Sequence, residues 1–252
     1  MILYDGSGNE VSTGGKNVLK GSKVVILADS IFDYEVPDTL NIGDYLTINY
    51  DCEVHNWAQG GCCMALGKAT NYDPYSFAGL SLALTTRDFT DQIANAAERS
   101  FEEQVEDMQS FSMATCDFLI VGYGTNDFWR AAPVENDEDD DDPEYFKGAI
   151  KYGVNKLLTS NPSLKLLFLN LQQMNPTYID TGGIGWVYPE PYNTGINEMC
   201  ESLSVPVLDI WGTALINDYT AESFYHSGRP HLSRNGKLRY ATMIANALDF
   251  YY

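Results

Sequence analysis

Residues 23–30 read KVVILADS, a continuous apolar run followed by two polar side chains. An uninterrupted apolar run such as 24–27 is typical of a strand that is buried on both faces of a parallel sheet. Asp29 and Ser30 follow at the point where such a strand ends. Four further strands are predicted from similar apolar runs at 53–57, 118–123, 164–171 and 205–210.

Helical patterns separate these predicted strands. Apolar residues recur every three or four positions in 90–111 (Ile93, Ala97, Phe101, Val105, Met108) and in 144–159 (Phe146, Ile150, Val154, Leu157, Leu158). Ser233 is the expected N-cap of a last helix that runs to about residue 250. Alternating strands and helices predict an α/β, three-layer, flavodoxin-like fold around a central, mostly parallel five-stranded sheet.

The chain of 252 residues fits one domain of this class. We therefore expect a single domain over 1–252, in which residues 1–22 form a short appendage. Within that appendage, 2–12 reads as a hairpin because Asp5-Gly6 and Gly8-Asn9 separate two short alternating runs.

The composition excludes several classes of function. A formal net charge of −20 repels the phosphates of nucleic acids and anionic lipid headgroups, so no nucleic-acid partner is expected. No apolar run is long enough to insert into a membrane, and residues 1–9 lack the features of a signal peptide. We expect a soluble chain, although this bounds its localisation only weakly. Five cysteines without a C-x-x-C pair predict mostly reduced thiols.

Two long stretches, 66–88 and 172–191, read as irregular loops that either face a substrate or pack on the surface. Tyr178, Trp186 and Tyr188 in the second stretch have the side chains to stack on a sugar ring, and packing explains them equally well. The acidic run 135–142 reads as a solvated loop, since it lacks the spacing of a calcium-binding loop.

Four short segments could carry chemistry, because three follow predicted strands and ligands sit beyond the carboxyl ends of parallel strands. They read ADS at 28–30, NWAQGG at 56–61, GYGTND at 122–127 and, just before the last predicted helix, SGRPHL at 227–232. Each is weak alone, since serines cap helices, paired glycines make turns and a lone histidine is usually structural.

Together, their order and spacing resemble the blocks of the SGNH (GDSL-type) hydrolase family: G-D-S, N-x-A-x-G-G, G-x-N-D and D-x-x-H. The resemblance covers the chain from about residue 23 to its end. It implies that Ser30 is a nucleophile and His231 its general base. The implied oxyanion donors are the backbone N–H groups of Ser30 and Gly61 and the side chain of Asn126.

Asp29, Asp127 and Gly228 occupy supporting positions in the same blocks. Ala28 replaces the first glycine of G-D-S, a mild change if its φ is not positive. Gly228 replaces the acid that usually orients the histidine. Three alternatives are open. A backbone carbonyl near 227–228 orients His231, a remote carboxylate such as Glu222 takes the place of the acid, or the site has lost its activity. We favour a working Ser–His dyad.

Other reactive side chains have simpler explanations. Cys62 and Cys63 read as buried packing residues, and Asp209 as a cap or turn residue. The three histidines, His55, His226 and His231, lack the spacing of a metal site, so neither a metal nor a cofactor is expected.

The leading hypothesis is a serine esterase that hydrolyses short acyl esters, with O-acetyl groups on carbohydrates inferred from what similar enzymes do. Its substrate would be a small-molecule or glycan ester. The alternative is a catalytically weakened SGNH domain that serves as a glycan-binding or structural module of a larger assembly. An unrelated flavodoxin-like domain is the third hypothesis, and it predicts that Ser30, Gly61, Asn126 and His231 do not converge.

Overall fold

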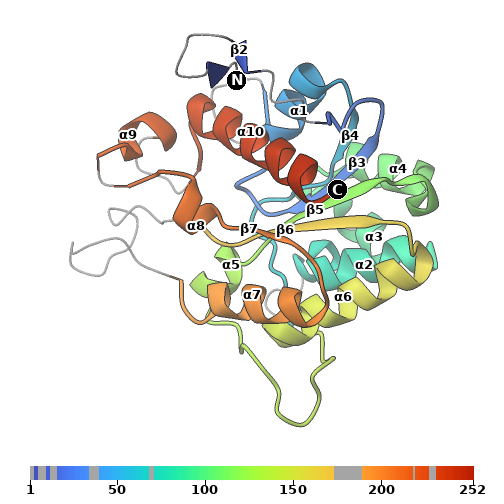
Figure 1. Ribbon diagram of the computed structural model, residues 1–252. Coiled ribbons are helices and arrows are strands. Elements are labelled where there is room, and N and C mark those ends of the chain that lie inside the picture. Colours follow the sequence, from blue (N-terminus) through green and yellow to red (C-terminus); the bar gives the residue numbers. More distant parts are fainter. Residues whose placement is uncertain are drawn as a thin grey trace.

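The computed structural model describes residues 3–4, 10–11, 16–33, 40–67, 71–172, 189–217, 219–226 and 231–252. Its central sheet has five parallel strands in the order β4-β3-β5-β6-β7 (Figure 1). Their bounds are β3 Lys23–Ala28, β4 Glu53–Asn56, β5 Phe118–Gly122, β6 Lys165–Leu169 and β7 Val207–Leu208. All five predicted strands are confirmed. The last is shorter than 205–210 because Asp209 already caps the helix that follows.

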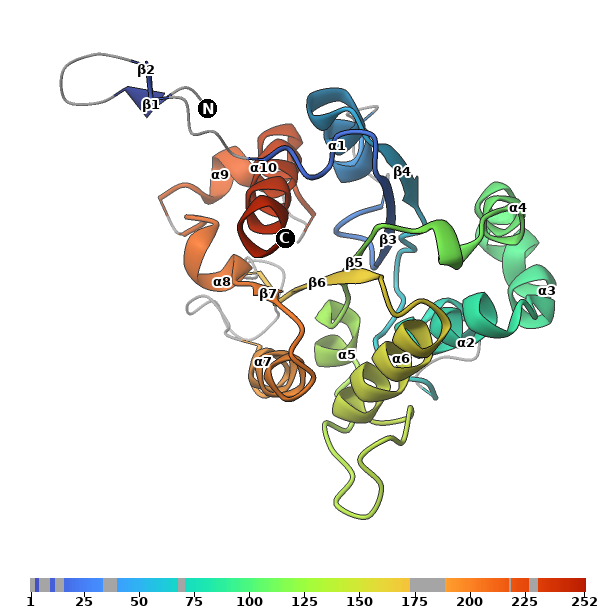
Figure 2. The same ribbon diagram turned by 45° about the vertical axis from the view of Figure 1, so that its right-hand side comes forward.

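Helices cover both faces of this sheet, which gives the three layers seen in Figure 2. Helices α1 (Ile42–Tyr50) and α10 (Arg234–Tyr251) pack on one face, and α2 (Phe77–Thr86), α6 (Phe146–Ser160) and α7 (Tyr192–Ser202) on the other. The remaining helices are η1 (Asp73–Tyr75), α3 (Thr90–Arg99), α4 (Glu102–Ser110), η2 (Met113–Thr115), α5 (Thr125–Trp129), α8 (Ile210–Thr213) and α9 (Ala221–Phe224).

The apolar run of β3 supplies both cores. Val24 and Ile26 pack among the side chains of α1 and α10, whereas Val25 and Leu27 pack among those of α2 and α6. All four side chains are fully buried, as predicted. Burial of each contributes about 1.5–3 kcal/mol relative to exposure, so this strand anchors both layers.

Within the range predicted as an N-terminal hairpin, the short strands β1 (Leu3–Tyr4) and β2 (Glu10–Val11) pair in antiparallel fashion. Residues 16–22 then lead into β3 along the main body. The Val18 N–H donates to Asp249 Oδ1 at 2.9 Å, and Leu19 is buried beside α10.

The single helix predicted over 90–111 was wrong. It is broken into α3 and α4 at Ser100, whose φ of 53° is left-handed and ends the first helix. The break changes which face is buried. Ile93 is 53% exposed and Ala96 is buried in place of Ala97, while Phe101, Val105 and Met108 are buried as expected.

The stretch 66–88 is only partly irregular, because α2 occupies 77–86. Its sequence is apolar on several sides, so it lacks the stripe that marks an amphipathic helix. The helix is buried against α6, where a Cβ on Gly153 would lie 2.4 Å from Phe77 Cε1. Close packing against α6 stabilises α2, although its sequence lacks the periodic pattern that would predict a helix.

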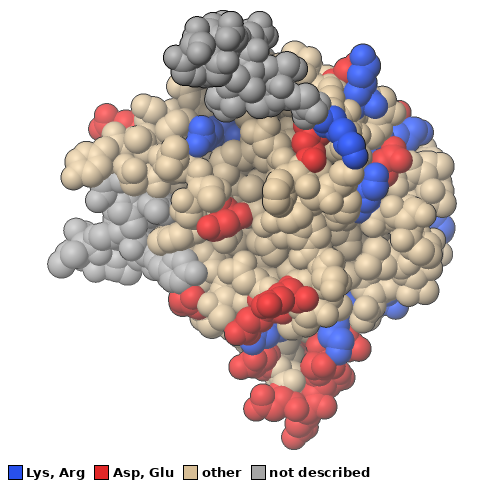
Figure 3. Space-filling model, viewed as in Figure 1, with Lys and Arg blue, Asp and Glu red and all other residues tan. Residues whose placement is uncertain are grey.

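The acidic run 135–142 is largely exposed, as predicted, and forms the red projection at the bottom of Figure 3. Lys151 Nζ lies 2.6 Å from Asp140, and Lys147 Nζ lies 2.6 Å from Glu135. Within the described residues, no three His, Cys, Asp or Glu side chains are grouped as a metal site requires. Nor does that part of the chain contain a helix with the length and apolar character to cross a membrane.

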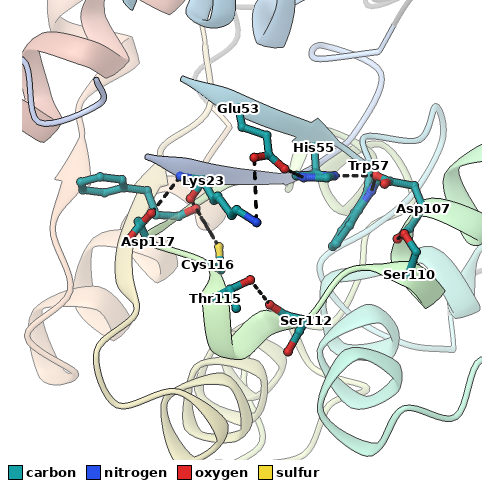
Figure 4. A network of polar contacts seen from close by, with 11 residues as sticks. Lys23, Glu53, His55, Trp57, Asp107, Ser110, Ser112, Thr115, Cys116 and Asp117 are labelled. Atoms are coloured by element: carbon teal, nitrogen blue, oxygen red, sulfur yellow. Dashed lines mark hydrogen bonds and ion pairs between the residues drawn. The ribbon is translucent and has the colours of Figure 1, made fainter. Parts of the chain in front are cut away.

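The edge strand β4 carries a network of polar contacts, drawn in Figure 4. His55 Nδ1 lies 2.8 Å from Asp107 Oδ2, and its Nε2 lies 3.0 Å from Glu53 Oε1. Trp57 Nε1 also donates to Asp107, at 2.7 Å, and Lys23 Nζ lies 3.9 Å from Glu53. His55 therefore ties the sheet edge to α4.

Candidate active site

Ser30 lies in a turn directly after β3. The Asp29 N–H donates to the Gly122 carbonyl at 3.2 Å, which extends the pairing of β3 with β5. The Phe32 and Asp33 N–H groups then donate back to the carbonyls of Asp29 and Ser30. This turn leaves Ser30 half-buried at the carboxyl edge of the sheet. Ala28 has extended backbone within β3, so the position does not require the glycine of the G-D-S pattern.

The end of β4 and the loop after it are bound to this turn at three points. The Gln59 N–H donates to the Ala28 carbonyl at 3.0 Å, and Asn56 Nδ2 donates to the Phe32 carbonyl at 3.0 Å. The Gly60 N–H donates to Asp33 Oδ2 at 3.1 Å. The loop that ends in Gly61 is thereby held beside Ser30.

Gly61 has a positive φ of 81°, a conformation that favours glycine. A Cβ at this position would lie 2.2 Å from Tyr72 Cε1 and 3.0 Å from Cδ1. The tyrosine ring thus occupies the space of a side chain. Backbone conformation and the close ring both require glycine here.

Asn126 and Asp127 lie in the first turn of α5 (Thr125–Trp129) and bind the same loop. Asn126 Nδ2 donates to the Cys62 carbonyl at 2.9 Å, which places the amide next to the Gly61 segment. Asp127 is fully buried and accepts the N–H groups of Met64 at 2.7 Å and Ala65 at 3.1 Å. These three bonds join the loop after β4 to the start of α5.

His231 precedes α10 and is half-buried. The His226 N–H donates to its carbonyl at 2.9 Å, beside an antiparallel bridge between Tyr225 and Leu232. Ser233 caps α10 by accepting the Gly236 N–H, as predicted. The short bridge and the helix start hold the backbone that follows the imidazole.

One cleft of about 630 Å³ brings Ser30, Gly61 and His231 together. Its other lining residues are Asp33, Gln59, Gly60, Asn71, Tyr72, Glu98 and Arg99. This convergence argues against an unrelated flavodoxin-like domain. Asn126 does not line the cleft, and its contact with Cys62 places it directly behind the Gly61 loop.

Sequence reasoning missed most of the polar residues that line this cleft. Asn71 and Tyr72 lie within 66–88, for which the sequence leaves open a substrate-facing loop or surface packing. The search at the carboxyl ends of strands does not find Arg99, because Arg99 ends helix α3 and α3 does not follow a strand directly. Its proximity to Gly60 arises from packing between distant segments and has no local signal.

Two buried carboxyls, Asp29 and Asp127, directly adjoin Ser30 and Asn126 in the sequence. Burial raises the pKa of Asp29 to about 7, although the Ile31 N–H, 3.0 Å from Oδ1, partly opposes this shift. Burial likewise raises the pKa of Asp127 to about 6, opposed by the N–H groups of Met64 and Ala65. Both acids therefore titrate well above the usual range of aspartate.

The structure describes some of the other residues considered in the sequence analysis and leaves others outside its described ranges. Cys62 and Cys63 are buried, as predicted, and burial raises the pKa of each thiol strongly. Asp209 caps α8 by accepting the Gly212 N–H at 3.0 Å, which confirms its structural role. Glu222 is exposed on α9. Gly228 and the predicted substrate-loop residues (Tyr178, Trp186, Tyr188) lie outside the described residues.

Comparison with known proteins agrees with this architecture. The profile of the GDSL-like lipase/acylhydrolase family matches residues 42–238, a range that contains Gly61, Asn126 and His231 and begins after Ser30. No curated protein matches the sequence.

Several solved structures share the fold. A Lactobacillus plantarum protein is 19% identical with a TM-score of 0.68, over 92% of this chain and 99% of that chain. The lipase/acylhydrolase of Enterococcus faecalis is 11% identical with a TM-score of 0.53, over 91% and 96%. An SGNH hydrolase candidate from Slackia heliotrinireducens is 10% identical with a TM-score of 0.55, over 91% and 100%.

Proposed function

Because the chain belongs to the GDSL-like lipase/acylhydrolase family, we propose that it is a serine esterase that uses Ser30 as its nucleophile. The observation that carries this proposal is the shared cleft of Ser30, Gly61 and His231. A serine hydroxyl needs a neighbouring base to become nucleophilic, and the tetrahedral intermediate needs donors placed in advance. The cleft holds candidates for both roles.

In the proposed reaction, His231 accepts the proton of the Ser30 hydroxyl while Oγ attacks the ester carbonyl. The resulting oxyanion accepts hydrogen bonds from the N–H groups of Ser30 and Gly61. Asn126, the third donor implied by the family pattern, does not line the cleft, and its amide instead supports the Gly61 loop through the Cys62 carbonyl. Collapse of the intermediate breaks the ester bond, and His231 returns the proton to the leaving alcohol. Water, activated by His231, then hydrolyses the acyl-Ser30 ester.

We propose a short acyl group, such as acetyl, on a carbohydrate alcohol. Support comes from the lining of the cleft, where Asp33, Gln59, Asn71, Glu98 and Arg99 offer hydrogen-bonding partners for hydroxyl groups. A long acyl chain needs an apolar channel, and Tyr72 is the one large apolar surface among these lining residues. The volume of about 630 Å³ lies within the range of small-molecule sites.

His231 is proposed to work in a Ser–His dyad, since Gly228 stands where the family pattern has an acid. A dyad retains nucleophile and base, the two groups whose loss is most damaging in serine proteases. The same glycine motivates the alternative, a weakened domain that binds acetylated glycans without turning them over.

The test is covalent labelling with a fluorophosphonate, followed by intact mass measurement and by peptide mapping. We expect one adduct on Ser30 in the wild type and in a control variant, Ser202→Ala, at the exposed end of α7. Ser30→Ala should carry none, and His231→Ala should lose turnover of p-nitrophenyl acetate. An unlabelled wild type, or equal labelling of Ser30→Ala, contradicts the covalent mechanism. Binding of acetylated glycans without turnover supports the alternative.

A further inference from the structure

The peptide unit between Gly60 and Gly61 is bonded at its carbonyl end. Arg99 Nη2 donates a hydrogen bond to the Gly60 oxygen at 2.5 Å. In a planar trans peptide the C=O of one residue and the N–H of the next point in opposite directions. The bond at Gly60 therefore fixes the direction of the Gly61 N–H, which is the second proposed oxyanion donor.

The charge of the guanidinium adds to this effect. Hydrogen bonds from an ionised donor are stronger than neutral ones, and arginine is always ionised in proteins. A hydrogen bond at a peptide oxygen also polarises the unit, so that its N–H becomes a better donor. Arg99 thus lies one peptide away from the position where the negative oxygen would form.

Arg99 is itself held in place. It is the last residue of α3, where a cation interacts favourably with the helix dipole. Its Cζ lies 3.7 Å from the centroid of the Tyr72 ring, and that ring packs on Gly61. Arg99, Tyr72 and Gly61 therefore form one contiguous set of contacts beside the cleft.

We propose that Arg99 is a positioning residue that orients and polarises the Gly60–Gly61 peptide for oxyanion binding. The inference rests on the proposed esterase activity of Ser30. Arg99 does not touch the reacting atoms in this scheme, since it acts through the peptide. Its loss should lower transition-state stabilisation with little change in ground-state binding.

The chain offers a matched control. Arg130 Cζ lies 4.6 Å from the centroid of the same Tyr72 ring, and its Nη1 contacts Cys63 Sγ at 3.6 Å. Arg99→Met and Arg130→Met each remove one guanidinium from that ring. Only Arg99→Met removes the bond to the Gly60 carbonyl, and Arg130→Met removes the Cys63 contact in its place, so a larger loss of kcat in Arg99→Met is attributed to the bond at Gly60. Thermal unfolding of both variants verifies that they fold.

With p-nitrophenyl acetate, we expect kcat of Arg99→Met to fall about tenfold, less than the ~100- to 1000-fold loss for removing a whole oxyanion donor. KM should change little. The inhibition constant of a boronic acid, which adds to serine as a tetrahedral anion, should rise in step with the loss of kcat/KM. Methylguanidinium should partly restore the activity of Arg99→Ala, a recovery that a purely structural role does not predict.

The outcomes separate this inference from the activity on which it rests. A wild type that neither reacts with fluorophosphonate nor turns over the ester overturns the proposed function and the inference together. An active wild type in which Arg99→Met and Arg130→Met have equal kcat overturns the inference alone. Equal losses of substrate and boronic acid affinity in Arg99→Met also overturn it.

Discussion

Replacing Gly61 by alanine should damage both stability and catalysis, for reasons that can be separated. The backbone at Gly61 has a φ of 81°, and the left-handed region costs a residue with a Cβ about 1–2 kcal/mol. The new Cβ would also lie 2.2 Å from Tyr72 Cε1, so the ring must move away from Arg99 and Arg130. Each of these two cation–π contacts contributes about 0.5–1 kcal/mol.

These contributions together predict a loss of about 2–4 kcal/mol in the free energy of unfolding. Gly21→Ala is the matched control, because Gly21 has a φ of 72° and no atom lies within 4 Å of its added Cβ. That variant should lose only the backbone contribution of about 1–2 kcal/mol. Urea unfolding of the three proteins measures the difference.

The same pair of variants tests the role of the Gly61 N–H. Gly61→Ala keeps the N–H, but the strained backbone and the clash with Tyr72 turn it away from the cleft, so we expect kcat for p-nitrophenyl acetate to fall, at most by the about 100- to 1000-fold that losing an oxyanion donor costs. Gly21→Ala should retain the wild-type kcat. Equal destabilisation of the two variants would refute the steric reasoning, and full activity of Gly61→Ala would refute the assignment of its N–H.

Two further predictions concern the buried carboxyls. Asp127→Asn should reduce the free energy of unfolding by about 2–3 kcal/mol, because the amide can accept only one of the N–H groups of Met64 and Ala65 and leaves the other unsatisfied; urea unfolding that matches the wild type would contradict this. For Asp29, burial raises the pKa from 3.8 to about 7, so between those values the folded protein keeps a proton that the unfolded chain has lost. Stability should therefore fall as pH rises through this window, and it should fall less in Asp29→Asn when unfolding at pH 5 is compared with pH 8.

The sequence was sufficient to predict the sheet, because its information is local. Four consecutive apolar residues in β3 have no solvent-facing position, so both faces must be covered. The carboxyl ends of parallel strands meet at one edge, which is why segments as distant as Ser30 and Gly61 could be expected in one cleft.

Other features depend on contacts that the sequence does not display. Nothing in 90–111 marks Ser100 as the point where the helix breaks, since serine rarely adopts a positive φ. The bond from Arg99 to the Gly60 carbonyl joins residues 39 positions apart, and it forms only because α3 ends beside the loop after β4. Pattern reasoning finds periodic and motif residues, and it misses side chains whose partner is a backbone atom elsewhere.

The contacts of His55 also bear on how the protein behaves when it is concentrated. An open sheet exposes backbone groups along its outermost strands, and these can template the addition of a strand from a neighbouring molecule. On the β4 side, the charged side chains of Glu53 and Asp107 flank the imidazole, and charged side chains on an edge strand disfavour such pairing. On the β7 side, the ladder is only 2 residues long. Both borders of the sheet are therefore poor starting points for intermolecular β-aggregation.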